Sequence, residues 1–134
     1  TTLPSDDRQK GAVAVKDMLL IHASHRDWTK AAQEEVQPLL DAHQSFLDDL
    51  RDADLLVSAG GLHPANQSTT VRVDNGKAIH TDGPYIETKE QIGGFYVIDT
   101  PTRDEALRWA ARLAEFNECP VEVRSVIEDP RWPK

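Results

Sequence analysis

The sequence predicts one α+β domain with a ferredoxin-like βαββαβ sandwich and an inserted β-hairpin. First, 134 residues suit a single hydrophobic core. Second, short apolar runs alternate with two amphipathic segments in the order strand, helix, strand, strand, helix, strand, which is the split βαβ plan. Third, an Asn-Gly turn marks a hairpin between the second and third of these strands. The composition, with 39% hydrophobic and 28% charged residues, is typical of a globular protein.

The first half of the chain begins with a strand and a helix. Residues 13–22 contain a short apolar run whose length favours a buried strand. Residues 31–50 carry apolar side chains at the three-and-four spacing of an amphipathic helix. Because proline is tolerated only in a first turn or at a kink, Pro38 predicts a short helical piece before Gln37 and a main helix from there to Arg51.

A second strand and the hairpin follow this helix. Residues 55–59 form an apolar run, and Gly60-Gly61 ends it where the backbone turns sharply or comes close to another group. Residues 69–73 and 77–81 flank a turn that contains Asn75-Gly76, a pair that suits the positive φ angles of a type I′ turn.

The second half supplies the last three elements. Gly93-Gly94 leads into an apolar strand at residues 95–98. Thr102 and Glu105 have the spacing of a capping box, so a helix begins there. Residues 121–127 form the closing strand.

The predicted domain covers residues 13–128, between a flexible polar arm at residues 1–12 and a polar tail at residues 129–134. An antiparallel sheet with both helices on one face leaves the other face uncovered. A second copy of the chain is the simplest cover, so we expect a homodimer.

Charge and composition exclude several classes of partner. A formal net charge of −8 gives no electrostatic basis for binding nucleic acid. No apolar run approaches the roughly 20 residues that cross a bilayer, so we expect no membrane association. Cys119 is the single cysteine, which rules out an internal disulfide and favours a reducing, cytoplasmic location.

One segment resembles a known family signature. Residues 82–96 match the signature of the YCII-related (DGPF) family, in which Asp-Gly-Pro-Phe is followed by Glu-Thr-Lys-Glu-Gln and then by Gly-Gly-Phe/Tyr. Here the three parts read Asp82-Gly83-Pro84-Tyr85, Glu87-Thr88-Lys89-Glu90-Gln91 and Gly93-Gly94-Phe95-Tyr96. The resemblance extends over residues 16–126. Tyr85 departs from the usual Phe, and residues 115–120 lack the glycines expected before the last strand.

The resemblance implies a dimeric α/β barrel with a cleft beside the central sheet. It also implies two alternative functions. Some YCII-related proteins resemble small lyases in which a His and an Asp act together, for example in dehydrochlorination of a hydroxylated ring. Others accompany extracytoplasmic-function sigma factors. The expectations are therefore a cofactor-independent lyase or isomerase with a His general base acting on a small polar or cyclic metabolite, or a non-catalytic ligand-binding or regulatory partner protein.

His43 is the candidate base. It falls inside the apolar stripe of the predicted helix, so it faces inward, and an imidazole titrates close enough to neutrality to accept a proton. By the resemblance it matches the helix His of catalytic YCII-related proteins. Asp82 opens a turn held by Gly83 and Pro84 and is the candidate carboxylate that orients His43. The alternatives are a His satisfied within the core and an Asp that bonds only to nearby backbone N–H groups.

Four further residues are candidate substrate contacts. Lys89 offers a positive charge to an anionic substrate, and Tyr85 and Tyr96 offer hydroxyl groups in a cleft that holds a ring, although core packing is the alternative for Tyr96. His22 lies at the end of the first strand. His22 and His25 also raise the question of a metal, but they have no cysteine partner and no metal-binding motif, so we expect neither metal nor cofactor.

Overall fold

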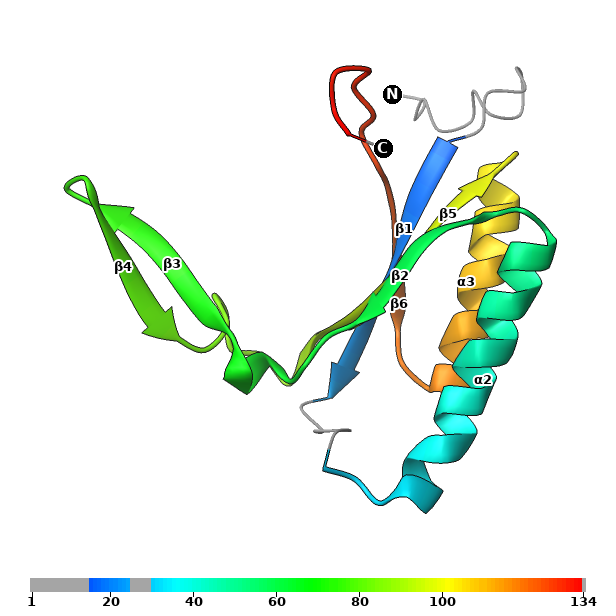
Figure 1. Cartoon of the computed structure of the whole chain (residues 1–134), viewed down its shortest axis with the longest axis horizontal. Helices are drawn as coiled ribbons and strands as arrows, with labels where there is room; N and C mark the ends of the chain where they lie inside the picture. Colours follow the sequence, from blue (N-terminus) through cyan, green and yellow to red (C-terminus); the bar gives the residue numbers. More distant parts are fainter. Residues whose placement is uncertain (1–14, 25–29, 134) are drawn as a thin grey trace.

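The computed structural model describes residues 15–24 and 30–133 of the chain. It contains a four-stranded sheet with the order β2-β5-β1-β6, in which all neighbouring strands are antiparallel. The sheet strands are β1 (Val15–Ser24), β2 (Leu56–Gly61), β5 (Glu90–Thr100) and β6 (Val121–Ser125). Two helices cover one face of this sheet (Figure 1). The predicted ferredoxin-like α+β fold and the order of its elements are therefore confirmed.

The helices differ in how closely they follow the prediction. Helix α3 (Arg103–Asn117) begins as expected, because the Thr102 side chain accepts a hydrogen bond from the Glu105 backbone N–H at 3.1 Å. Helix α2 (Gln33–Asp52) is one continuous helix with Pro38 inside it, so the predicted break before Gln37 is wrong. Pro38 lies in the second turn, where it removes one backbone hydrogen bond near the helix end, and the continuous apolar stripe still packs on the sheet.

The hairpin is confirmed. It consists of β3 (Thr69–Asp74) and β4 (Lys77–Asp82), and Asn75 and Gly76 in its turn have φ angles of 50° and 77°. A 3-10 turn, η2 (Ala65–Gln67), precedes it. β3 and β4 form a separate two-stranded sheet that stands away from the main sheet (Figure 1).

Both glycine pairs belong to strands: the first ends its strand, as predicted, whereas the second lies inside a strand that was expected to begin after it. Gly60-Gly61 closes β2, and Gly93-Gly94 lies within β5, which begins at Glu90. These segments pair with each other along the strand edge. The expectation that the backbone comes close to another group here is confirmed, since a Cβ on Gly94 would lie 3.1 Å from the Gly60 carbonyl oxygen.

The core lies between the sheet and the two helices. Its buried members are Leu19, Ile21, Phe46, Leu50, Tyr96, Ile98, Ala106, Ala110 and Leu113. Side chains alternate along a strand, so the neighbours of the core residues in β1 and β5 point to the other face. That face carries Met18 opposite Val97 and Leu20 opposite Phe95. We call it the open face, because neither α2 nor α3 covers it.

Within residues 30–133, neither helix combines the length and the apolar character of a membrane span. The predicted arm at residues 1–12 lies outside the described residues. In the predicted tail, Asp129 and Arg131 form a local ion pair of 2.6 Å.

Candidate functional site

A cavity of about 390 Å³ lies between α2 and the β2–β5 edge of the sheet. Helix α2 contributes an apolar wall that includes Val36, Leu39 and Leu40. The segment 62–65 closes one side, and β1 contributes Ile21 and Ala23. Most of the wall is apolar, with a small number of polar groups, as in small-molecule sites.

Two paired glycines in the sheet leave part of the cavity floor without side chains. Gly61 pairs directly with Gly94, so a side chain on either would point to the same face. A Cβ on Gly94 would lie 3.6 Å from the Ile21 side chain, which belongs to the core between sheet and helices. A Cβ on Gly61 would meet no atom within 4 Å. The glycines therefore leave open space on the helix side of the sheet.

The polar centre of the cavity is His43. Its Nδ1 lies 2.5 Å from the Tyr96 hydroxyl on β5, and its Nε2 lies 2.8 Å from Oδ1 of Asn117 at the end of α3. The Asn117 oxygen can only accept, so Nε2 carries the proton and Nδ1 has the free lone pair. Tyr96 therefore donates its hydroxyl proton to Nδ1. Phe116 packs edge-on against the His43 ring, with ring centroids 5.0 Å apart.

Burial sets the protonation states of this pair. It lowers the pKa of His43, and the hydrogen bond to Asn117 only partly opposes this effect. It also raises the pKa of Tyr96 to about 12. At neutral pH the cavity therefore holds a neutral imidazole and a protonated phenol, joined by one short hydrogen bond.

Comparisons with known proteins agree with this architecture. A model of the YCII-related domain matches residues 18–130. The chain belongs to the YCII-related family. A relative from Rhizobium meliloti (strain 1021), named as an uncharacterized protein, is 39% identical over 90 residues, which are 67% of this chain and 70% of that protein. The predicted family membership is confirmed.

Three predicted site residues of this YCII-related chain lie outside the lining of the cavity. Asp82 ends β4 and is exposed. Tyr85 is 70% exposed, with the Arg72 guanidinium 5.1 Å from the centre of its ring. Lys89 is exposed on the segment that leads into β5. Both ring nitrogens of His43 bond to other residues, so within one chain the structure does not bring Asp82 to His43.

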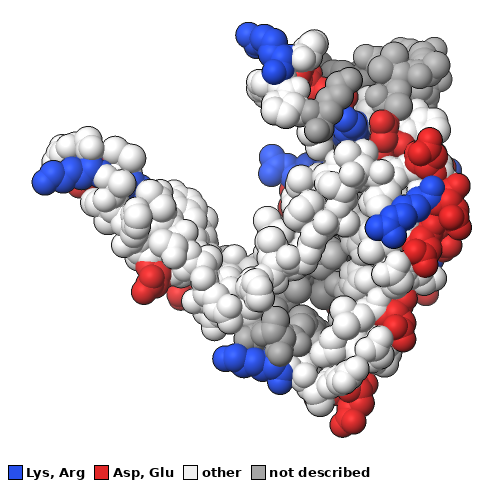
Figure 2. Space-filling view, viewed as in Figure 1, with Lys and Arg blue, Asp and Glu red and all other residues white. Residues whose placement is uncertain are grey.

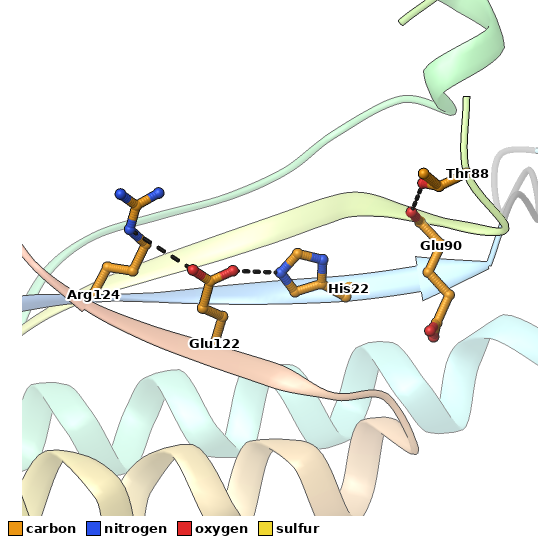
Figure 3. Close-up of polar contacts among 5 residues, drawn as sticks. All are labelled: His22, Thr88, Glu90, Glu122 and Arg124. Atoms are coloured by element: carbon orange, nitrogen blue, oxygen red, sulfur yellow. Dashed lines mark hydrogen bonds and ion pairs between the residues drawn. The ribbon is translucent and has the colours of Figure 1, made fainter. Parts of the chain in front are cut away.

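His22 lies on the other side of the sheet. Its Nε2 is 2.8 Å from Oε1 of Glu122, and Arg124 lies 3.7 Å from the other oxygen of the same carboxylate. Figure 3 shows these three side chains on the side of the sheet away from the helices, together with the Thr88 hydroxyl that donates to the Glu90 carbonyl. His25 lies outside the described residues. Within residues 15–24 and 30–133, no group of three or more His, Cys, Asp or Glu residues could hold a metal ion.

Two parts of the site were not predicted. Asn117 carries no local signal, since it ends α3 and meets His43 across 74 positions of sequence. The glycine floor had a signal, because the sequence shows two Gly-Gly pairs, but their pairing with each other depends on the order of the strands.

The lowered pKa of His43 can be measured by NMR titration of its ring protons. We expect His43 to titrate below its ordinary value of 6.5. The unfolded chain then takes up this proton at a higher pH than the folded chain, so this group reduces the stability of the fold as pH falls below about 6.5. His43→Gln should flatten that part of the stability profile. A His43 pKa above 6.5 would contradict the role given to burial.

Proposed function

We propose that the cavity binds a small, mainly apolar or cyclic metabolite and that His43, acting through Tyr96, accepts a proton from it. The reaction would be a cofactor-independent elimination or isomerisation. The observation that carries this proposal is the neutral imidazole whose lone pair points at the Tyr96 hydroxyl within an apolar cavity. An imidazole kept neutral by burial can accept a proton at neutral pH.

The proton would move in two linked transfers. A C–H or O–H bond of the substrate breaks as its proton passes to the Tyr96 oxygen, while the Tyr96 hydroxyl proton passes to Nδ1 of His43. Tyr96 stays a neutral phenol, and His43 becomes an imidazolium whose Nε2–H bonds to Asn117. In an elimination, the electron pair of the broken C–H bond forms a double bond and expels a leaving group with its bonding electrons. In an isomerisation, the electron pair forms a double bond at a new place, and the proton returns from His43 through Tyr96 to another carbon, which leaves His43 neutral again.

Binding without catalysis is the competing function. It is favoured by the engagement of both ring nitrogens of His43, which is also what a purely structural polar contact requires. In that case the cavity would hold a ligand and the chain would act as a regulatory partner, for example of a sigma factor.

Three further features support the oligomeric state, the class of ligand and the cellular location that we propose. The open face, on which Met18 and Phe95 are partly exposed, supports a homodimer. The net charge of −8 supports a small-molecule ligand over nucleic acid. The single cysteine, Cys119, supports a cytoplasmic setting.

The experiment uses nitrobenzisoxazole, an aromatic probe that opens when a base removes its ring C–H proton and the N–O bond breaks. The coloured phenolate product gives the rate directly. We expect the protein to accelerate this opening and His43→Gln to lower the acceleration by about 100-fold or more, as for loss of a general base. NMR shifts of the His43 ring protons would first establish that the probe binds in the cavity.

Two variants show whether the rate depends on the cavity and whether the proton passes through Tyr96. His80→Gln is the matched control, because His80 lies on β4, outside the lining of the cavity, and should keep the wild-type rate. Tyr96→Phe removes the linking hydroxyl, so the rate should fall if the proton passes through Tyr96 and should persist if His43 accepts it directly. A probe that binds beside His43 without any acceleration would favour the non-catalytic function.

A further inference from the structure

His63 lies at the opening of the cavity, on the segment that leads from β2 to the β3–β4 hairpin. The residue is exposed, and its side chain belongs to the cavity lining. A second hollow of about 360 Å³ lies beside the cavity, and His63 lines that hollow too. In the described part of the chain, His63 is the only titratable residue of the wall that the two hollows share. This wall consists of Leu62, His63, Pro64, Ala65, Gln91 and Ile92.

The backbone on both sides of His63 is held in place. Leu62 donates its backbone N–H to the Gly93 carbonyl at 2.9 Å, which extends the contact between β2 and β5 by one residue. Pro64 has a φ of −53° and precedes η2, and the Gln67 backbone N–H donates to the Pro64 carbonyl at 2.9 Å. Because the backbone is fixed, only the side chain of His63 has to be ordered when a ligand binds, which keeps the entropic cost of binding low.

The imidazole of His63 is available to a ligand. The polar centre uses its own donors internally, and the side-chain amide of Gln91 donates to the Ile86 carbonyl at 2.7 Å. Among residues 15–24 and 30–133, no hydrogen bond, ion pair or ring contact engages the His63 ring. Ser24 is another unengaged polar side chain of the cavity lining, but it lies on β1 and does not border the second hollow. An imidazole has one N–H donor when neutral and two when protonated, so His63 can donate in either state.

The register of β2 and β5 separates His63 from the polar centre. Ala59 pairs with Tyr96, which donates to the polar centre, and Gly61 pairs with Gly94 in the glycine floor. His63 follows two residues after Gly61, a spacing that places its side chain on the same face. Four residues of extended chain cover roughly 13 Å, so His63 lies about that far along the strand from the level of Tyr96. The glycine floor therefore lies between two groups that can bind the two ends of one ligand.

The walls of both hollows lack charged side chains. Within the described residues, neither lining contains Asp, Glu, Lys or Arg. Figure 2 shows acidic side chains gathered along the helix layer, whereas the surface where the hairpin meets the main sheet is mostly uncharged. Burial and the Glu90 carboxylate raise the pKa of the Cys119 thiol, so the charge of Glu90 lies towards Cys119. An imidazole donor in such apolar surroundings favours a negatively charged acceptor, because a charge-assisted hydrogen bond is stronger than a neutral one.

We propose that His63 binds a carboxylate oxygen of the substrate by donating a ring N–H to it. The substrate is then a small molecule with an apolar or cyclic body over the glycine floor, a proton-donating group at the Tyr96 oxygen and a carboxylate at the other end. A single ring with a short side chain, and with a hydrogen bond of about 3 Å at each end, spans a distance of this order. This inference rests on the proposed function, because it requires that the cavity binds the metabolite.

The test compares two phenols that differ at one end. The first probe, hydroxyphenylpropanoate with the hydroxyl group para to the side chain, carries a carboxylate, and the second probe, para-propylphenol, has a methyl group in its place. Dissociation constants are measured by NMR titration of the amide signals of cavity residues such as Leu39 and Gly94. His63→Leu should weaken binding of the carboxylate probe by about tenfold and leave binding of propylphenol unchanged. His63→Gln retains a side-chain N–H donor and should retain most of the affinity for the carboxylate probe.

Two control variants should bind both probes as the wild type does. Ser24→Ala removes the other unengaged polar side chain, and His80→Leu changes an exposed histidine outside both linings. If His63→Leu bound the carboxylate probe as tightly as the wild type, or if Ser24→Ala lost this affinity instead, the role of His63 would be overturned and the cavity would remain a binding site. If neither probe shifted the cavity signals of the wild type, both this inference and the proposed function would be wrong.

The orientation of the carboxylate probe can be tested in the wild-type protein without any substitution. Intermolecular nuclear Overhauser effects should connect the methylene protons beside the carboxylate with His63 and Ala65. The ring protons beside the hydroxyl group should instead contact His43 and Leu47, at the other end of the cavity. A probe that bound in the reverse orientation, with its carboxylate side beside His43, would overturn the proposal.

Discussion

Gly61→Leu is expected to remove probe binding at the cavity while the fold persists. The reason is geometric, because a Cβ at this position meets no atom within 4 Å and points to the helix side of the sheet, where the cavity lies. A leucine would fill the space that a ligand needs. We expect nitrobenzisoxazole opening to fall to the background rate, a loss at least as large as the roughly 100-fold effect of His43→Gln.

A graded series shows whether the loss follows the volume of the side chain. Gly61→Ala should lose little, Gly61→Val more and Gly61→Leu most, with thermal unfolding close to wild type throughout. Gly60→Ala is the contrasting control, because its Cβ would lie 3.0 Å from the Phe95 ring and would disturb packing on the open face instead. If Gly61→Leu bound and opened the probe as the wild type does, the cavity would not be the site.

Phe46→Ala is expected to destabilise the fold by about 3–5 kcal/mol. Phe46 has no exposed surface and packs against three aromatic rings, those of Tyr96, Trp109 and Phe116. Two of these rings also contact His43. The substitution would therefore leave a void beneath the polar centre and loosen the ring positions around it.

Urea denaturation followed by circular dichroism measures this change in the free energy of unfolding. Leu107→Ala is the control, because that side chain is 42% exposed and should lose about 1 kcal/mol or less. A Phe46→Ala variant as stable as the control would mean that Phe46 does not hold the layers together.

The sequence predicted what local chemistry determines. The helix boundary at Thr102 and the turn at Asn75-Gly76 follow from a few neighbouring residues, and both are confirmed. The strand order follows from the alternation of apolar runs with helices. The break at Pro38 failed because a proline near a helix end removes only one hydrogen bond, which the packing of the whole apolar stripe outweighs.

The hydrogen-bond partners of His43 could not be predicted from the residues near it in the sequence. The helical stripe placed His43 on the inner face, but Tyr96 and Asn117 reach it across 53 and 74 positions of sequence. The rigidity of the Asp82 turn predicts a fixed carboxylate but says nothing about the direction in which the β3–β4 hairpin leaves the sheet. The tertiary arrangement sets this direction, and Figure 1 shows the β3–β4 hairpin and α2 on opposite sides of the main sheet.

The hydrogen bonds of the polar centre also decide which molecules it can recognise. The Tyr96 hydroxyl proton goes to His43, and the Nε2 proton of His43 goes to Asn117, so neither proton is left for a guest. What the pair offers is the remaining lone-pair capacity of the Tyr96 oxygen. A ligand whose polar group is only a carbonyl would find no hydrogen-bond donor in this pair. An alcohol, a phenol or an amine could donate to the Tyr96 oxygen. At this pair, the cavity therefore favours a group that donates a hydrogen bond over one that only accepts.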